Sequence, residues 1–483
     1  MITESDQVAR FEPAEASLDK RIGSLCAAHT GASGLEVLAS NVSAFAARRM
    51  SAQRATRSLD LMYYVWGEDL TGRLLLSEVL AAADRGVKVR LLLDDIGVSS
   101  RDNLLKALNS HAQITVRLFN PVNAFSGSRR RLSEVARRLF SMTRRMHNKA
   151  WITDSLYAIM GGRNIGDAYF DADEMSNFRD LDLLAVGPVV DEAETMFDRY
   201  WKSELVTPMR PSNDGVKRWS VLSDLRSAGE SPEAQSYLDR VLEETCGDFP
   251  DSANLHWSNQ ARLIADPPEK ALGRHGENGL MGIVLPVLEA ARQRIAITSP
   301  YFVPGKAGTD RLTGIANRGI KIRVLTNSLA ATDVAAVHGG YAHYRMPLLQ
   351  AGVDLYELRQ VAPKRRLSFR GKSHASLHTK AFSVDGATGF IGSLNFDPRS
   401  TSLNTEMGVL FDAPDLVTSM DQLFADEIAS DVSYAVRLDK QARLSWIGTE
   451  EHGPVIYHRE PGASLIRRAI ARIVGWLPLE SQL

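Results

Sequence analysis

The chain has little cysteine, few prolines and no long apolar run. Its two cysteines, Cys26 and Cys246, lie far apart without a metal-ligating cluster near them, which excludes a disulfide framework and a cysteine-based zinc site and favours a reducing compartment. Nineteen prolines in 483 residues are too few for a long disordered region. No stretch approaches about 18 uninterrupted apolar residues, and the acidic start MITESDQVARFEP lacks the apolar core of a signal peptide. We therefore expect any membrane contact to be made from the cytoplasmic side.

An overall excess of charge is also missing, since the formal net charge is -1. Basic residues are instead gathered locally. Residues 129–145 contain seven arginines and one acid, Glu134, and a smaller basic cluster lies within 364–372. Each basic segment precedes one copy of the motif described next.

The motif H-x-K-x-x-x-x-D occurs twice. The first copy is His147, Lys149 and Asp154, and the second is His378, Lys380 and Asp385. Each copy continues into an apolar strand and a glycine-rich turn that ends in Asn164 or Asn395. The offset is constant, because 378 minus 147 and 385 minus 154 both give 231. This repeat predicts two related halves, in agreement with the roughly two domains expected at this length.

Strands and helices alternate in both halves. A strand at 58–66, a helix at 70–85 and a strand at 87–95 are repeated as 294–302, 310–317 and 320–327. This alternation predicts an α/β fold with parallel or mixed sheets. Further helices are expected at 18–28 and 42–57. The expected domains are an N-terminal arm (1–34), a first half (35–210), a connecting segment (211–260), a second half (261–450) and a C-terminal tail (451–483).

The motif residues form the candidate catalytic set. Side chains at i and i+2 of a strand share a face, so each histidine should stand beside the lysine of its own copy. Asp154 and Asp385 precede Ser155 and Gly386, where a hairpin turn is expected, and we interpret them as turn or supporting residues rather than proton carriers.

Four further polar residues follow the motifs. Asn164 and Asn395 lie in glycine-rich turns that allow close approach of a ligand, and are candidates for binding phosphate oxygens. Asp182 and Glu406 occupy matching places further on, where a carboxylate could orient an imidazole.

Two imidazoles, two ammonium groups and two amides suit phosphodiester chemistry without a metal. One imidazole would attack phosphorus to give a phosphohistidine, while the other would protonate the leaving alcohol and later deprotonate the incoming one. The lysines and asparagines would stabilise charge on the non-bridging oxygens. A single copy would be interpreted as structural, as are the isolated His338 and His343; the doubled constellation favours catalysis.

These motifs are the signature of the phospholipase D superfamily, which the chain resembles from about Val42 onward. More narrowly, RRMHNKAWITD, GGRNIGDAYF and FRDLDLLAVGPVV resemble segments of bacterial cardiolipin synthases of the C type. The resemblance implies two α/β/α halves around a pseudo-twofold axis, with one active site at their interface. It also implies transfer of a phosphatidyl group onto phosphatidylglycerol, giving cardiolipin and a small alcohol. No cofactor and no metal are expected.

The resemblance also implies roles for the histidines. In the superfamily the first-motif histidine is commonly the nucleophile, which would make His147 the attacking group and His378 the acid and base; nothing in the sequence fixes this order. The two copies differ at one place, where Gly162 stands in the first and Ser393 in the second.

The expected partners are phospholipid substrates and an anionic membrane surface, at the inner face of a bacterial cell membrane, with no nucleic acid. Two segments could contact lipid, namely a basic amphipathic helix around 132–139 and the segment 464–477. The alternative is that their apolar faces pack on the protein's own core.

Three other functions fit parts of this pattern. A hydrolytic phospholipase D would use the same residues and accept water. A nuclease would use the arginines for a phosphate backbone, although the chain lacks an obvious base-stacking aromatic platform. A catalytically inactive membrane-binding scaffold would not need histidine and lysine in both copies.

Overall fold

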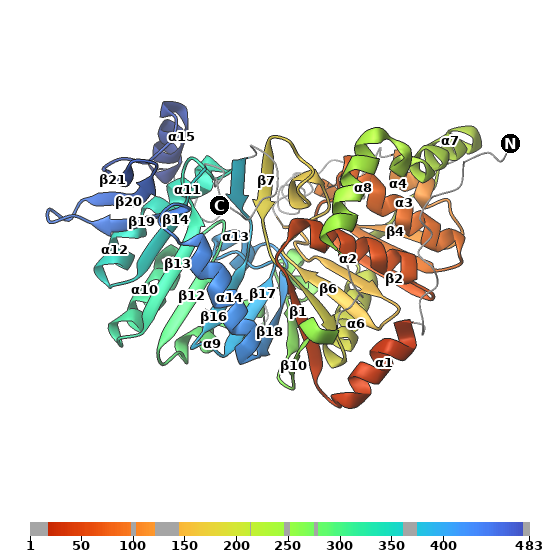
Figure 1. Cartoon of the computed structure of the whole chain (residues 1–483), viewed down its shortest axis with the longest axis horizontal. Helices are drawn as coiled ribbons and strands as arrows, with labels where there is room; N and C mark the ends of the chain where they lie inside the picture. Colours follow the sequence, from red (N-terminus) through yellow and green to blue (C-terminus); the bar gives the residue numbers. More distant parts are fainter. Residues whose placement is uncertain are drawn as a thin grey trace.

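The computed structural model describes residues 18–97, 103–120, 144–212, 214–245, 252–274, 279–360 and 374–476. Two large mixed sheets lie side by side, and helices cover their faces (Figure 1). The α/β fold predicted from the alternating elements is confirmed.

Within the described residues the first sheet has nine strands. In spatial order they are β10 (His256–Ser258), β1 (Ser33–Leu38), β8 (Asp182–Val186), β6 (Tyr157–Gly161), β5 (Ala150–Thr153), β2 (Ser58–Tyr63), β3 (Lys88–Asp94), β4 (Ile114–Phe119) and β9 (Val206–Pro208).

The second sheet has ten strands in the same described ranges. Their order is β11 (Arg262–Ala265), β18 (Met407–Asp412), β17 (Thr388–Gly392), β16 (Ala381–Val384), β12 (Arg294–Thr298), β13 (Lys321–Asn327), β14 (Asp354–Leu358), β19 (Ser433–Leu438), β20 (Leu444–Glu450) and β21 (Gly453–Tyr457).

The internal repeat of the sequence is also a repeat of topology. The order β1-β8-β6-β5-β2-β3-β4 of the first sheet recurs as β11-β18-β17-β16-β12-β13-β14 in the second. In both runs the last three strands are parallel, and β5 or β16 joins them in antiparallel register. The two halves are therefore copies of one folding unit.

Helices connect and cover these strands. Those of the first half and the connection are α1 (Leu18–Ala28), α2 (Asn41–Arg54), α3 (Leu70–Asp84), α4 (Asn103–Leu108), α6 (Pro188–Trp201), α7 (Gly215–Arg226) and α8 (Pro232–Glu244). Those of the second half are α9 (Leu280–Glu289), α10 (Gly305–Asn317), α11 (Ala335–Ala342), α12 (Arg345–Gln350), α13 (Pro398–Ser402), α14 (Pro414–Glu427) and α15 (Leu465–Trp476).

The predicted helices and strands agree with these bounds to within a few residues. The expected helix at 18–28 is α1, and the helix at 70–85 is α3 with its N-terminus capped by Asp69, whose carboxylate accepts from Gly72 N. The helix expected at 310–317 begins earlier, at Gly305. The connecting segment contributes β10 to the first sheet, and the tail contributes β21 to the second.

A shared apolar core joins the halves. One cluster of buried side chains contains Met160 and Leu183 from the first sheet together with Ile391, Met407 and Val409 from the second. Two other clusters belong to the first and the second half separately. The sheets thus meet where β6 and β8 pack near β17 and β18, which are the strands that follow the two motifs.

Candidate active site

Each motif segment is hydrogen-bonded to the opposite half. Thr405 N donates to Arg145 O and His147 N donates to Thr405 O, both at 2.9 Å. In the second copy, β15 (His374–Leu377) pairs in parallel with β7 (Ser176–Arg179), and His378 N donates to Arg179 O at 2.7 Å. The repeat is therefore crossed, because each histidine is anchored to a segment of the other half.

His147 is held by a carboxylate from the second half. Its Nδ1 lies 2.8 Å from Oε2 of Glu406. Because an ionised carboxylate only accepts hydrogen bonds, Nδ1 carries the proton and Nε2 is left for a reacting group. The ring is buried, with 8% of the residue exposed, and contacts the Tyr64 ring edge-on at 5.2 Å between centroids.

Glu406 accepts two further hydrogen bonds. Ser393 Oγ donates to its Oε2 at 2.5 Å and Ser400 Oγ donates to its Oε1 at 2.7 Å. Burial raises the pKa of Glu406, but the neighbouring His147 and Lys149 outweigh burial, so the net pKa lies below the ordinary value. The group beside His147 is thus an ionised carboxylate, as the expected orienting role of Glu406 requires.

His378 is held by Asp180. Its Nδ1 lies 2.5 Å from Oδ2 of Asp180, which belongs to the first half. The imidazole is flanked by Phe178 at 4.9 Å and by Tyr169 at 5.2 Å between ring centroids. Burial raises the pKa of Asp180, and the positive charges of Lys380 and Arg163 partly offset this effect.

The orienting role predicted for Asp182 is wrong. Its carboxylate is fully buried in ion pairs with Arg48 at 2.8 Å and Arg163 at 3.4 Å. Strand pairing shows that Asp182 does not correspond to Glu406. Gly161 pairs with Asp182 in the first sheet, and the equivalent Gly392 pairs with Gly408 in the second. Asp182 is thus the counterpart of Gly408.

The counterpart of Glu406, two residues earlier, is Asp180. An alignment of the apolar strands LLAV and VLF in the sequence would have found this correspondence, because both strands begin three residues after the orienting carboxylate.

Each lysine of the motif stands beside its histidine, as predicted. Lys149 Nζ donates to His147 O at 2.7 Å, while Lys380 Nζ contacts His378 O and lies 2.8 Å from His378 Nδ1. Burial lowers the pKa of Lys149 to about 7 despite Glu406, and lowers the pKa of Lys380 to about 8 despite Asp180.

Burial lowers the pKa of both imidazoles as well, and the two lysines add to the effect. The resting site therefore favours neutral imidazoles next to cations that an anionic ligand would stabilise.

Asp154 and Asp385 lie at the far end of β5 and β16 from the histidines. Both have positive φ, at 55° and 54°. Asp154 accepts backbone hydrogen bonds from Thr56, Arg57 and Ser58 at 2.7–2.8 Å, and Asp385 accepts from residues 292–294 at 2.8–2.9 Å. These carboxylates fix the hairpin turn to the start of β2 or β12, and the structure does not bring them to the imidazoles.

The asparagines differ in their surroundings. Asn164 accepts from Val65 N at 3.3 Å and donates to Tyr169 Oη at 2.9 Å. Asn395 Oδ1 is buried and has no hydrogen-bond partner among the described residues.

The difference between Gly162 and Ser393 matches the carboxylate beside each. A Cβ at Gly162 would overlap the Asp180 carboxylate, whereas the Ser393 hydroxyl binds the longer Glu406 side chain. The serine contact that is missing from the first copy is therefore replaced by closer packing of Asp180.

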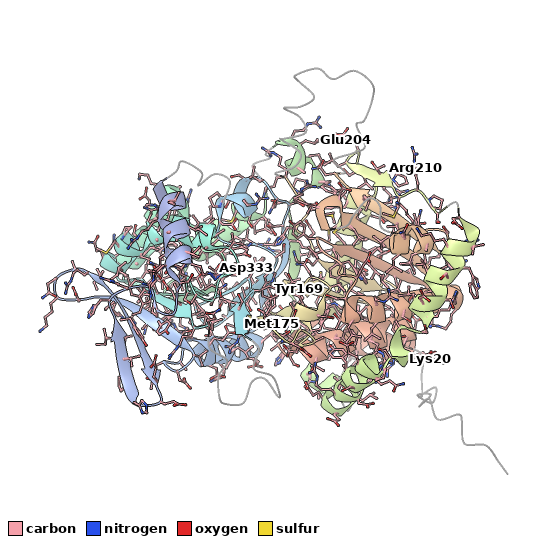
Figure 2. All side chains as sticks on the ribbon, turned by 90° about the horizontal axis from the view of Figure 1, so that it is seen from above. Lys20, Tyr169, Met175, Glu204, Arg210 and Asp333 are labelled. Carbon is pink, nitrogen blue, oxygen red and sulfur yellow. The ribbon has the colours of Figure 1, made fainter. Side chains whose placement is uncertain are left out.

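Sequence reasoning missed the aromatic and acidic residues that surround the imidazoles. Tyr301 Oη donates to Asp333 at 2.7 and 2.8 Å, and Asp333 acts electrostatically on His378, Lys380 and Tyr169. Figure 2 labels Tyr169 and Asp333 at the junction of the halves. No signal pointed to these residues, because they lie outside the repeated motifs.

One group of possible metal ligands lies outside the motif site. Ligand atoms of His338, Glu357 and Glu460 are within 4.8 Å of one another. Arg345 occupies this cluster, contacting His338 and bonding to Glu357 at 3.0 Å and Glu460 at 2.6 Å. The guanidinium bridges the two carboxylates, so His338 belongs to a structural ion cluster, in line with its interpretation from the sequence.

The arginine-rich segment 129–145 is described by the structure only at its end, Arg144 and Arg145. Residues 121–143, with the helix expected around 132–139, lie outside the described residues, as does the basic cluster within 364–372. Arg144 and Arg145 are buried, with Arg144 Nη1 donating to Lys270 O at 3.2 Å and Arg145 Nη1 lying 3.3 Å from Asp94 Oδ1. These two arginines thus support the fold and do not belong to an exposed basic face.

Comparison with known proteins agrees with this geometry. The family model described as cardiolipin synthase, phospholipase D-like domain, matches residues 50–201 and 284–428. Cardiolipin synthase C of Escherichia coli (strain K12) is 40% identical over 476 residues, covering 94% of this chain and 97% of that protein. Cardiolipin synthase B of Escherichia coli O6:H1 is 25% identical, covering 88% and 85%.

Among solved structures, phosphatidylserine synthase of Haemophilus influenzae Rd KW20 has the same fold, with a TM-score of 0.59 at 12% identity and coverage of 94% of this chain and 96% of that one. The doubled motif, the crossed imidazole–carboxylate pairs and these similarities lead to one assignment. The chain belongs to the cardiolipin synthase family of phospholipase D-like proteins.

Proposed function

We propose that the protein is a phosphatidyltransferase that forms cardiolipin from phosphatidylglycerol through a phosphohistidine intermediate. The observation that carries this proposal is the pair of buried imidazoles, each bound at Nδ1 by a carboxylate of the opposite half and each beside a lysine. The similarity to cardiolipin synthases supports the choice of lipid substrate.

In the first step, Nε2 of one imidazole attacks the phosphorus of the donor lipid. A P–N bond forms and the P–O bond to the headgroup breaks, while the second imidazole, which the bound anionic phosphodiester favours in its protonated form, gives its proton to the leaving oxygen. In the second step that imidazole, now neutral, takes the proton of a phosphatidylglycerol hydroxyl, whose oxygen attacks phosphorus and breaks the P–N bond.

The lysines and Asn395 support these steps electrostatically. Lys149 and Lys380 face charge that develops on the non-bridging oxygens, and burial strengthens such interactions. The free Oδ1 of Asn395 accepts a hydrogen bond from the incoming lipid headgroup. Glu406 and Asp180 keep Nε2 directed at phosphorus and stabilise each imidazole when it is protonated.

The protein would act as a peripheral enzyme on the inner face of the cell membrane. No helix in the described ranges has the length and apolar character needed to cross a bilayer. Its lipid substrates would then be reached from a surface contact, with anionic lipids as the binding surface.

The first test is the product profile of the pure protein on phosphatidylglycerol vesicles, with and without phosphatidylethanolamine, beside His147→Ala and His378→Ala. We expect cardiolipin from the parent protein and none from either variant, with released glycerol or ethanolamine identifying the donor. Phosphatidic acid alone would identify a hydrolase, and near-normal turnover in either variant would refute the two-histidine mechanism.

The order of the histidines is open to a trapping experiment. With a phosphatidyl donor that carries p-nitrophenol, the leaving group needs no protonation. The variant that keeps the nucleophile should then accumulate phosphoenzyme that survives quenching in alkaline detergent, where the P–N bond is stable, whereas the variant that lacks it should form none. If His147 attacks, phosphoenzyme accumulates in His378→Ala only.

We also expect chelators to leave the rate unchanged, because the proposed steps use imidazole and ammonium groups alone. The measurement is cardiolipin formation with and without excess EDTA. Strong inhibition that a divalent ion reverses would contradict this mechanism.

A further inference from the structure

Helix α15 presents four large apolar side chains outward. Leu465 is 80% exposed, Ile466 74%, Ile473 62% and Ile470 41%. At 100° per residue these positions cover an arc of roughly 140° on one side of the helix. A surface helix of a soluble protein normally turns such a stripe toward the core, so α15 is oriented the opposite way. The interpretation that this face packs on the protein's own core is wrong.

The inward face of α15 packs closely on α11. Ala471 is buried, and its carbonyl lies so near Gly339 that a Cβ at that glycine would overlap it. Ala471 also joins a small apolar cluster with Leu329 and Ala463. The helix therefore packs through Ala471, while Leu465, Ile466 and Ile473 stay mostly exposed.

Polar contacts hold the helix in this orientation. Arg467 Nη2 donates to Thr332 O at 2.6 Å, and its Nη1 donates to Ala330 O at 3.3 Å. Arg468 Nη2 donates to Glu460 O at 2.7 Å. Both arginines lie at the edges of the packed face, so rotation of α15 to bury its isoleucines would break these contacts.

The same contacts place α15 next to the active site. Thr332 precedes Asp333, the carboxylate that acts on His378 and Lys380. Figure 1 shows α15 and β7, whose end leads into Asp180, on the same upper side of the molecule, and Figure 2 views the molecule from that side. A surface that bound α15 would therefore lie on the side of the molecule where β7 is found.

From these observations we propose that the outward face of α15, formed by Leu465, Ile466, Ile470 and Ile473, is the surface through which the protein inserts into an anionic lipid bilayer. The occupant is a lipid surface because aliphatic side chains are combined with charge of one sign: α15 has three arginines, including the exposed Arg472, and no acidic residue. The inference deepens the proposed function, since it gives the site access to substrates in a membrane.

The test is cosedimentation of the full chain with phosphatidylglycerol vesicles, comparing the parent protein with Ile466→Glu/Ile473→Glu. We expect at least tenfold weaker binding, because two charges would enter the acyl boundary. The matched control is Val216→Glu/Trp219→Glu on α7 of the connecting segment, where the residues are 83% and 70% exposed. This control should bind as the parent does.

Two results would overturn the proposal. One is unchanged binding of the α15 variant, or equal loss in the α7 control, which would indicate a nonspecific charge effect. The other is conversion of a dimer into a monomer by the α15 variant with vesicle binding retained, since a second copy of the chain would then cover this face.

Activity separates this inference from the proposed function. The α15 variant should lose turnover on vesicles but keep it on short-chain phosphatidylglycerol below its micelle concentration. Loss of turnover on both substrates would contradict a docking role and point to a fold or site defect. Vesicle binding by α15 without any lipid turnover in the parent would leave the docking face in place and refute the transferase.

Discussion

At the residue scale, the central unit is an imidazole from one half bound to a carboxylate from the other. His147 pairs with Glu406 and His378 with Asp180, at 2.8 and 2.5 Å. Either half alone would present a histidine without its orienting group. The proposed catalytic unit therefore exists only where the two halves meet.

Substitution of Asp180 or Asp182, two neighbouring acids of the first half, tests this pairing. We expect Asp180→Asn to lower kcat by about 10²-fold or more while the fold persists, because the amide cannot stabilise a protonated His378. Asp182→Asn should instead lower the free energy of unfolding by about 3–5 kcal/mol, because it removes the carboxylate that pairs with the buried guanidinium groups of Arg48 and Arg163. Steady-state kinetics and urea unfolding of both variants give the comparison; the reverse pattern would restore Asp182 as the orienting residue.

The buried lysines set the expected pH dependence. The pKa of Lys149 is about 7, so its positive charge is lost as the pH rises through that value, and Lys380 follows near 8. Because both imidazole pKa values lie below 6.5, the nucleophilic imidazole should set an acid limb of kcat/KM below pH 6.5, and the general-acid imidazole begins to lose its proton in the same range. We therefore expect the alkaline fall of kcat/KM to steepen above about pH 7, where Lys149 and then Lys380 lose their charge.

Lys149→Arg is the control for this profile, because a guanidinium stays charged and should move the alkaline limb of kcat/KM upward. If the alkaline limb of kcat/KM stays at the same pH in Lys149→Arg, another group, such as the general-acid imidazole, determines its position.

At the scale of elements, the two hairpins after the motifs form the same type of turn with different residues. Asp385 and Gly386 both have positive φ, as a two-residue turn of type I′ requires, and Asp154 and Ser155 adopt the same conformation. Ser155 at φ 57° is exposed and lacks the conformational freedom of glycine. The first hairpin is therefore the more strained of the two.

Exchange of the turn residues should change stability in opposite directions. We expect Ser155→Gly to raise the free energy of unfolding by about 1 kcal/mol and Gly386→Ser to lower it by about 1 kcal/mol or more. Neither should alter kcat, because both turns lie at the far strand ends from the imidazoles. Denaturant unfolding with activity assays measures this, and a loss of activity in Ser155→Gly at full stability would contradict it.

At the scale of the whole molecule, the apolar cluster that contains Ile391 and Met160 makes the halves one unit. The site needs such rigidity, since its hydrogen bonds cross the junction. We expect both halves to unfold in a single transition.

Ile295→Ala tests this cooperativity, because Ile295 lies in the core of the second half alone. It should lower the free energy of unfolding by about 2–5 kcal/mol. The unfolding midpoint reported by fluorotryptophan at Trp151 of the first half should shift together with that at Trp446 of the second. A shift at Trp446 alone would show that the halves unfold independently.

The duplication, the α/β class, most element bounds and the histidines and lysines of the candidate site could be predicted from the amino-acid sequence. These features are local or repeat at a fixed offset. Apolar periodicity predicted α1, α3 and β3, and the constant offset of 231 residues identified the two motifs as a repeat. The turn role of Asp154 and Asp385 also followed from local hairpin chemistry.

The pairing of each imidazole with its carboxylate and the orientation of α15 depend on long-range packing and could not be predicted from the sequence. Asp180 and Asp182 are two residues apart in the sequence. Which of them binds His378 depends on strand register and on a contact between residues 198 positions apart. The direction of the α15 stripe depends on Gly339 and Thr332, which its own amphipathic pattern does not contain. Periodicity shows that a helix has an apolar face; what that face touches is set by long-range packing.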